Sequence, residues 1–217
     1  MTMTIRTSFM LGMLIASDVM GQASTSDCLG AIPLCGGLYT ETSAPLGTGN
    51  AYEFTGTCNA NLESASLWYT FTVQEAGNLS FILDPANDLD DHDWGLFNIT
   101  SGGCAGIQNG DSPEVNCNSY GSFTTNGPTG ISSANGGIGT TNGPGDTNGP
   151  PFNADLPVQV GQIYALVVMN WTGSPDGYTI DFTQSTASIY DQTPPYMVGV
   201  VADCANQAFY IAFSENV

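Results

Sequence analysis

The chain has 217 residues, with 20 acidic side chains, one arginine, no lysine and a formal net charge of -19. This charge excludes most nucleic-acid roles, because phosphate contacts need Lys and Arg, and it argues against docking on anionic lipid head groups. Apolar residues make up 41% of the chain, which is enough for the core of one ordinary domain with part of another.

Residues 1–22 have the pattern of a secretory signal peptide, with Arg6 near the start, an apolar run at residues 9–16 and small residues after it. A short buried helix is the alternative. The apolar run is shorter than the ~20 residues that cross a bilayer, so we expect no membrane span and a secreted or cell-surface protein. Cleavage near Gln22 leaves no Lys or Arg, so each carboxylate must be solvated, hydrogen-bonded or neutralised by a cation.

The six cysteines of the chain favour disulfide bonds, because an exported protein meets oxidising conditions. Zinc is disfavoured, since there is no CxxC pair and the chain has one histidine. A loop with Gly and Pro separates Cys104 from Cys117, and we predict that these two form a disulfide. We also predict a disulfide between Cys35 and Cys58. Cys28 is left without an assigned partner.

Alternation of apolar and polar residues predicts strands along most of the chain. In residues 66–73, Leu67, Tyr69 and Phe71 share one face, and the run 79–83 is expected to pair with this strand as a hairpin. Further strand-like runs are 93–99, 156–160, 163–169 and 178–182. Helical runs are absent, so we predict an all-β fold, a β-sandwich or jelly roll. The side chains expected in the core include Trp68, Tyr69, Phe71, Phe81, Trp94, Leu96, Tyr164, Leu166, Tyr178 and Phe182.

The stretch DPANDLDDHD, residues 84–93, raises the main question of this sequence, because five of its ten residues are Asp. A solvated loop, a metal site and a catalytic cluster are the competing explanations. We hypothesise a calcium site, because closely spaced carboxylates can supply several of the oxygens that calcium needs, and a hydrated acidic turn is the alternative. The candidate ligands are Asp88, Asp90, Asp91, Asp93 and Asn170, the last adding a carbonyl if its strand lies beside this one. His92 is interpreted as a polar loop residue rather than as a member of a catalytic triad.

Residues 119–153 are rich in Gly, Asn, Thr and Pro, and the motif TNGP occurs three times in them. They are predicted to form a surface loop between strands, with a ligand-binding loop as the alternative. Residues 187–195 are predicted to be a linker, and residues 196–217 contain two strand-like runs that look like the start of an immunoglobulin-like module. Two strands cannot bury a core, so we expect the N-terminal piece of a longer protein, in which Cys204 pairs beyond Val217.

The stretch SLWYTFTVQEAGNLSFILDPANDLDDHDWGLFNIT resembles the bacterial pre-peptidase C-terminal domain and its CUB-like relatives. The run FNADLPVQVGQIYALVVMNWTGSPDGYTIDF is similar to the last strands of that family. The resemblance covers about residues 27–186 and extends to modules of large exported proteins of the Bacteroidota. It implies a β-sandwich accessory domain that binds, spaces or adheres, and some relatives bind calcium through acidic loops.

The sequence carries no GxSxG, HExxH or GxxxxGK[ST] motif, so we predict no catalytic residues and no enzymatic activity in this chain. The favoured hypothesis is a binding or adhesion module for an extracellular glycan or surface protein, joined to further domains of the same polypeptide. The alternative is an accessory domain of a secreted hydrolase whose catalytic part lies outside the chain. A weaker alternative is a glycoside hydrolase, because that chemistry needs only two suitably spaced carboxylates.

Overall fold

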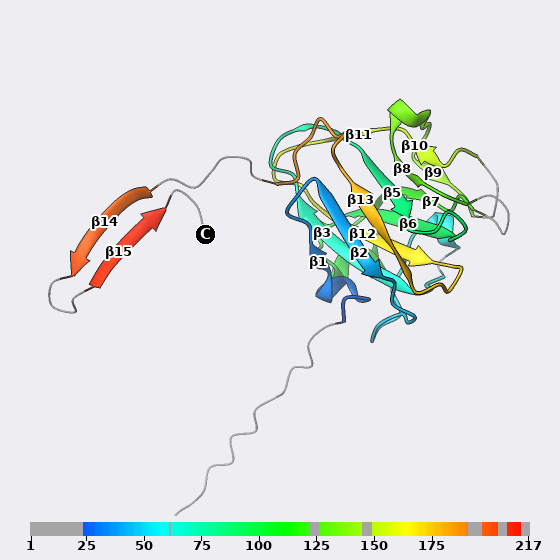
Figure 1. Cartoon of the computed structure of the whole chain (residues 1–217), viewed down its shortest axis with the longest axis horizontal. Helices are drawn as coiled ribbons and strands as arrows, with labels where there is room; N and C mark the ends of the chain where they lie inside the picture. The colour runs from blue at the N-terminus through cyan, green and yellow to red at the C-terminus, as the bar shows by residue number, and fades with distance from the viewer. Residues whose placement is uncertain are drawn as a thin grey trace, which may run out of the picture.

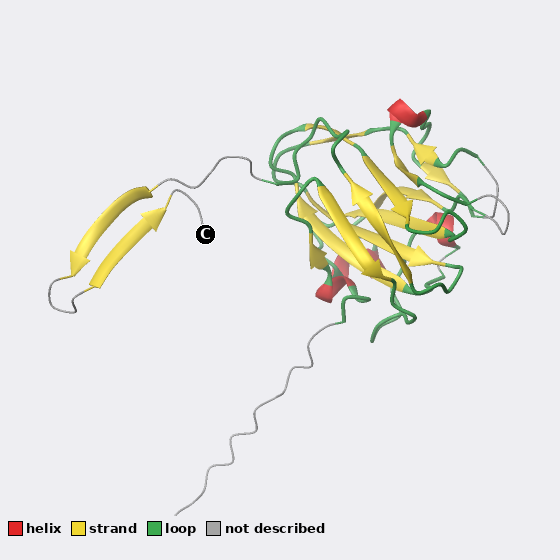
Figure 2. Ribbon diagram, viewed as in Figure 1, coloured by secondary structure: helices red, strands yellow, loops and turns green. Residues whose placement is uncertain are grey.

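Two β-sheets face each other in the computed structural model, which confirms the all-β sandwich predicted from the sequence (Figures 1 and 2). The residues that the structure describes are 24–60, 62–121, 126–144, 149–190, 197–203 and 208–213. The predicted signal peptide, Cys204 and parts of the predicted loop 119–153 therefore lie outside the described residues.

The strands form two large sheets and two small ones. The larger sheet has six strands, in the order β1 (Ile32–Pro33), β3 (Ser66–Thr72), β12 (Ile163–Asn170), β6 (His92–Asn98), β7 (Glu114–Asn118) and β9 (Thr141–Asn142). The other large sheet has five, in the order β10 (Phe152–Asn153), β8 (Thr129–Ile131), β5 (Phe81–Pro85), β13 (Asp176–Asp181) and β2 (Leu38–Ser43). The two small sheets pair β4 (Gly77–Leu79) with β11 (Leu156–Val158), and β14 (Met197–Asp203) with β15 (Ala208–Phe213).

Three of the four edges of the two large sheets are two-residue strands. They are β1, β9 and β10, and each pairs in parallel with its neighbour. Helical structure in the described part of the chain is limited to α1 (Ala105–Asn109), η1 (Cys28–Gly30), η2 (Thr57–Asn59) and η3 (Ser133–Asn135), the last three being 3-10 turns.

The main core lies between the two large sheets, and strand alternation builds it. All ten side chains that were expected in the core are at most 4% exposed. Nine of them point into the space between the sheets, while Trp68 points to the opposite face of the larger sheet. Aromatic rings dominate the centre, where Phe81 lies against Trp94 with ring centroids 5.1 Å apart. The alternation of apolar and polar residues in the sequence thus predicted which side chains fill the space between the two sheets.

A second, smaller core covers the outer face of the larger sheet. The sheet contributes Trp68, Phe97 and Met169, which are all fully buried. Irregular segments and α1 cover these side chains, and Phe54 packs with its ring 5.8 Å from that of Phe97. Gly95 permits this cover, because a Cβ there would collide with the main-chain oxygen of Thr55.

Both predicted disulfides are wrong. Cys28 bonds to Cys104 and Cys58 bonds to Cys117, with Cα atoms 5.6 and 5.8 Å apart, while Cys35 is free and exposed. The prediction assumed that Cys104 and Cys117 close a local loop. Instead, β7 holds Cys117 beside η2, and Cys104 caps α1 above the outer face, where it meets the N-terminal segment. The Cys58–Cys117 disulfide therefore fastens η2 to the sandwich, and the Cys28–Cys104 disulfide joins two of the segments that cover its outer face.

The hairpin predicted for residues 66–73 and 79–83 does not form. β3 pairs with β12 and β1, whereas β5 belongs to the other large sheet and pairs with β13 and β8. The chain between them crosses from one sheet to the other. Both strands direct apolar side chains into one core, and two facing sheets satisfy that pattern as well as a hairpin does.

Residues 119–153, predicted as a surface loop, contain the short strands β8, β9 and β10. Their asparagines point inward rather than toward a ligand. The Asn118 amide donates to the Asn153 side-chain oxygen over 2.9 Å, the Asn142 amide donates to the Asn118 side-chain oxygen over 3.1 Å, and all three residues are buried. This segment is therefore joined to the sandwich by side-chain amides as well as by Ile131 of β8, which is buried in the main core.

The sandwich also extends beyond its predicted end. Ala187 and Ile189 lie in the range predicted as a linker, yet both are buried in the main core. The two strand-like runs predicted near the C-terminus correspond to β14 and β15, which pair antiparallel. Val198 and Val201 of β14 are 55% and 66% exposed, so this hairpin presents apolar surface that two strands cannot bury alone. Its assignment to an immunoglobulin-like module stays a prediction.

Candidate functional site

The acidic stretch lies at one end of the sandwich, against the turn that joins β12 to β13. We name residues 84–93 and 170–176 together the loop end. The Trp171 N–H donates to the main-chain oxygen of Asp91 over 2.9 Å, and the Asp91 N–H donates to the Thr172 hydroxyl over 2.7 Å. These bonds continue the β6–β12 ladder, in which Asn170 pairs with His92. The two segments therefore form one connected surface.

Part of the predicted loop 119–153 also reaches the loop end. The Asn126 amide donates to the main-chain oxygen of Leu89 over 2.6 Å. Gly121 lies directly against the carboxylate of Asp91, and a Cβ at that position would collide with it. A glycine at 121 is therefore what lets this segment lie so close to the acidic stretch.

The five aspartates of the stretch do not share one environment. Asp84 and Asp88 are exposed, whereas Asp90 and Asp93 are 1% and 8% exposed. Partial burial raises the pKa of Asp84, and the neighbouring charge of Asp88 adds to this rise. Burial also raises the pKa of Asp90, opposed by a hydrogen bond from Ser174 and supported by the charge of Asp176. The stretch is thus not a uniformly hydrated acidic turn.

Alternation along β6 separates the predicted calcium ligands. His92 faces the inter-sheet core, where its ring meets Tyr178, so Asp91 and Asp93 project to the other side of the chain. In the described part of the chain, no three carboxylates among Asp88, Asp90, Asp91 and Asp93 bring their oxygens within 4.8 Å of one another. Calcium binding by this stretch remains a prediction that the geometry does not support further.

Asn170, the fifth predicted ligand, has its side chain engaged in the turn. Its side-chain oxygen accepts the N–H groups of Thr172 and Gly173 over 2.9 and 3.1 Å, and its amide donates to the main-chain oxygen of Ser174 over 3.1 Å. Asn170 therefore shapes the turn that carries Trp171, and its side chain has a structural role.

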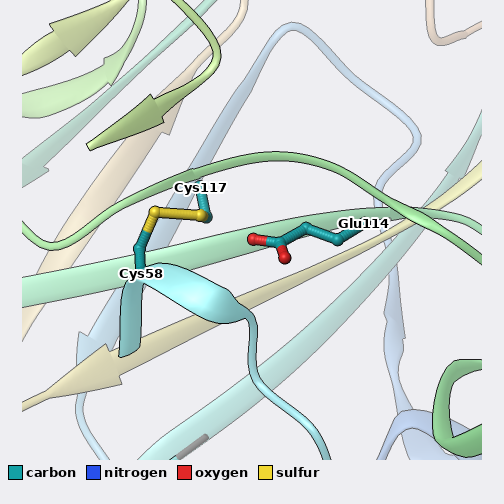
Figure 3. A group of neighbouring side chains, drawn as sticks. All are labelled: Cys58, Glu114 and Cys117. Carbon is teal, nitrogen blue, oxygen red and sulfur yellow. A yellow bond between two sulfur atoms is a disulfide. The ribbon is translucent and has the colours of Figure 1, made fainter. Parts of the chain in front are cut away.

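One group of possible metal ligands does gather, at Cys58, Glu114 and Cys117 (Figure 3). The two sulfurs form a disulfide, so neither is available as the thiolate that a metal would bind. The Glu114 carboxylate accepts the Thr57 N–H over 3.0 and 3.2 Å and so holds the first residue of η2. We assign this group a structural role.

His92 lies in a strand, whereas the sequence analysis interpreted it as a polar loop residue. It begins β6 and is 2% exposed, with its ring 5.2 Å from that of Tyr178 in an edge-on contact. Neither ring nitrogen has a hydrogen-bond partner of ordinary geometry. Burial lowers the pKa of His92 to about 4, and the Asp90 carbonyl opposes this shift only in part. The ring is therefore neutral at physiological pH and lies in the core, not in a loop.

A second acidic group, which the sequence did not reveal, lies among the segments that cover the outer face. Glu53 accepts the Cys28 N–H over 2.7 Å, and Glu63 accepts the Glu53 N–H over 3.0 Å. Asp27 accepts the N–H groups of Asn50 and Ala51 over 2.8 and 2.9 Å. These carboxylates come from distant positions in the chain, so no local motif could have indicated them. They join the N-terminal segment to the segment before β3.

The pKa values in this group follow from burial and from shared charge. Burial raises the pKa of Glu53 to about 7, opposed by the bond from Cys28 and supported by the charges of Glu63 and Asp27. Burial likewise raises the pKa of Glu63. Burial acts in the same direction on Asp27, but the bonds from Ala51 and Asn50 outweigh it and lower the pKa. Perturbed carboxyl groups can mark a catalytic site, yet here Glu53 and Glu63 each accept a main-chain N–H in the segments that cover the sheet.

A pocket of about 370 Å³ opens at the opposite end of the sandwich. Its walls are formed by Pro33, Leu34, Cys35, Thr70, Phe71, Thr72, Gln74, Ile163, Ile189 and Tyr190. The lining contains no Asp, Glu, Lys, Arg or His, and none of its residues belongs to the acidic stretch. The free thiol of Cys35 is the reactive group in this wall.

Comparisons with protein-family models, with curated proteins and with solved structures find no match. The resemblance to the pre-peptidase C-terminal domain therefore stays a prediction. Within the described residues, no helix combines the length and apolar character needed to cross a bilayer.

Proposed function

We propose that this chain is a non-catalytic binding module of a secreted or cell-surface protein, and that it binds a neutral glycan at the loop end. The observation that carries the proposal is Trp171. Its indole is 37% exposed, although its backbone is fixed to the acidic stretch by the bond to Asp91. An aromatic ring that is open to solvent on a fixed backbone is suited to stack on the apolar face of a sugar.

The exposed carboxylates support the same ligand class. Asp84 and Asp88 lie in the loop end, and ionised carboxylates accept hydrogen bonds from hydroxyl groups. The sequence has no Lys or Arg after Arg6, so nothing in the sandwich would attract a phosphate, a sulfate or an acidic sugar. A neutral polyhydroxylated ligand matches both the aromatic ring and the acceptors. The two disulfides are compatible with an extracellular location.

A glycan array with the full chain tests this proposal, followed by calorimetry on any sugar that binds. We expect Trp171→Ala to weaken binding by about tenfold or more, since loss of a well-placed aromatic contact is worth on the order of 1–2 kcal/mol. Tyr52→Ala is the matched control, because Tyr52 is 63% exposed and lies beside α1 on the outer face. Trp171→Ala should not lower the melting temperature. Equal binding by both variants, or binding only to basic proteins, would contradict the proposal.

An accessory role beside a secreted catalytic domain would use the same surface, and ligand identity separates the two functions. A module that anchors a hydrolase should prefer the glycan that the hydrolase cleaves, whereas an adhesion module should prefer one displayed on a host or neighbouring cell.

Hydrolysis by the chain itself has one observation in its favour, the raised pKa of Glu53 beside Glu63. We expect no catalysis, because main-chain groups occupy both carboxylates. The check is the release of reducing ends from any bound glycan. Turnover that Glu53→Gln and Glu63→Gln both abolish would establish a glycosidase.

A further inference from the structure

Two strands face each other at the loop end. His92 on β6 meets Tyr178 on β13 across the sandwich, with ring centroids 5.2 Å apart. Asp176 and Tyr178 are two residues apart on β13, so their side chains share one side of the strand. Asp90 lies just before β6, at the end of a turn in which its N–H donates to the Asn87 carbonyl over 2.8 Å. The charge of Asp176 contributes to the raised pKa of Asp90, which indicates that the two carboxylates lie near each other.

Buried polar atoms at this end of the sandwich lack hydrogen-bond partners. Asp90 is 1% exposed and its Oδ2 atom accepts no hydrogen bond, and His92 is 2% exposed with neither ring nitrogen in a hydrogen bond of ordinary geometry. A buried carboxylate oxygen or imidazole nitrogen without a hydrogen-bond partner is destabilising, because it has lost its water and gained no other partner. Such atoms are rare in folded proteins and indicate an ordered water or an ion. Here they occur within three residues of one short segment.

The chemical identity of these atoms restricts what can bind. An imidazole nitrogen with a carboxylate oxygen is a donor set for zinc and its neighbours among the divalent transition metals. Calcium prefers a shell of oxygens alone. In a chain with no Lys or Arg after Arg6, no protein cation can take this place. We propose that Asp90 and His92, together with Asp176, bind a divalent transition-metal ion of the zinc class.

Metal binding would require the ligand atoms of the three residues to move closer together. In the described structure the ligand atoms of Asp90, His92 and Asp176 do not all lie within 4.8 Å of one another. Asp176 is exposed, so its carboxylate can rotate toward Asp90 and His92. Water would supply the remaining ligand of a four-coordinate ion. This site shares Asp90 with the predicted calcium loop but differs from it in its other ligands, because Asp88, Asp91 and Asp93 take no part in it.

Metal binding can be measured on the full chain, without a histidine tag and after treatment with a chelator. Calorimetry and thermal melts with zinc chloride report affinity and stabilisation, since an ion that binds only the folded state raises its melting temperature. Cobalt(II) gives visible absorbance in a four-coordinate site. His92 is the only histidine, so its ring nitrogen signals in NMR are assigned without ambiguity and should shift when zinc is added.

Variants at exposed positions test the site without removing buried side chains. Asp176→Asn changes an exposed side chain and should weaken zinc binding by about tenfold or more, and His92→Gln should abolish it. Asp88→Asn is the matched control, because it removes the same charge from the loop end at an exposed position outside the site. It should leave zinc binding unchanged. If His92→Gln does not fold, Asp176→Asn and the NMR shift still test the site.

Three outcomes would overturn the proposal. They are no zinc-dependent heat or melting shift, His92 ring signals that do not respond to zinc, or equal affinities in Asp176→Asn and Asp88→Asn. Ring signals that do not respond to zinc would indicate that an ordered water, and not a metal ion, contacts the buried polar atoms. The proposal does not depend on glycan binding, and a negative glycan array leaves it untouched.

Discussion

The two faces of the six-stranded sheet are buried in different ways, although the same strands supply both. The inner face meets a second sheet, and regular alternation fills the space between with aromatic and branched side chains. The outer face meets irregular chain, and the small core there includes Trp68, Phe97 and Met169. What holds that cover in place is the Cys28–Cys104 disulfide and the acceptor bonds of Asp27, Glu53 and Glu63. Regular packing thus stabilises one face, and covalent and polar links stabilise the other.

The largest effect should come from the inner face. Phe81 is fully buried, with ring contacts to Trp94 and Phe182, so Phe81→Ala should lower the free energy of unfolding by about 3–5 kcal/mol. The matching change on the outer face, Phe54→Ala, removes a half-buried ring and should lower it by about 1 kcal/mol. Urea denaturation of both variants measures the difference. Equal losses would mean that ring packing on the two faces of the sheet contributes alike to the free energy of unfolding.

The disulfide on the outer face should have the next largest effect. Replacing Cys28 and Cys104 by Ser opens a link between positions 76 residues apart, which should lower the free energy of unfolding by about 2–4 kcal/mol. Amide hydrogen exchange should rise in the covering segments before it rises in β5 and β13. Cys35→Ser is the control, since this cysteine is free and exposed, and it should change neither measurement. Uniform loss of protection across both sheets would show that the cover is not a separate unit.

The smallest effect should be the pH dependence of the cover. Folding raises the pKa of Glu53 from 4.5 to about 7, so the folded state holds this proton more tightly than the unfolded chain. The stability from this group is therefore complete below pH 4.5 and declines as the pH rises toward 7. The melting temperature should fall between about pH 5 and 7.5, because Glu53 ionises in the folded protein over this range. Glu53→Gln should flatten this decline, while Glu75→Gln, at an exposed position, should not. A decline of equal slope in both variants would remove Glu53 as its source.

The sequence predicted the inner face well, because that face depends on a local rule. Residues at every second position in 66–73 and 93–99 share a side, whichever strand becomes their neighbour. Strand pairing does not follow from such a rule. β3 and β5 are close in sequence, yet they belong to different sheets, because apolar alternation specifies which side is buried and not which strand lies alongside.

The outer face and the loop end were predicted less well, for related reasons. The cover is irregular, so nothing periodic marks Phe54 or Glu53 as buried, and the disulfide partner of Cys28 lies 76 residues away. At the loop end, the density of Asp suggested one shared environment. The start of β6 at His92 divides the stretch instead, since alternation along β6 directs His92 into the core and Asp93 to the other side. Knowing where the strand begins would have corrected the prediction, but boundaries depend on the ladder with β12.

The short parallel strands at the sheet edges have a consequence for how copies of this module behave when they are crowded. An open strand edge invites another chain to add on and leads to aggregation, and natural proteins limit this by keeping edges short. β1, β9 and β10 each leave only two residues at an edge. The fourth edge, β2, is longer but carries Glu41 among polar and exposed neighbours. The two large sheets therefore offer little open edge on which another copy of the chain could add a strand.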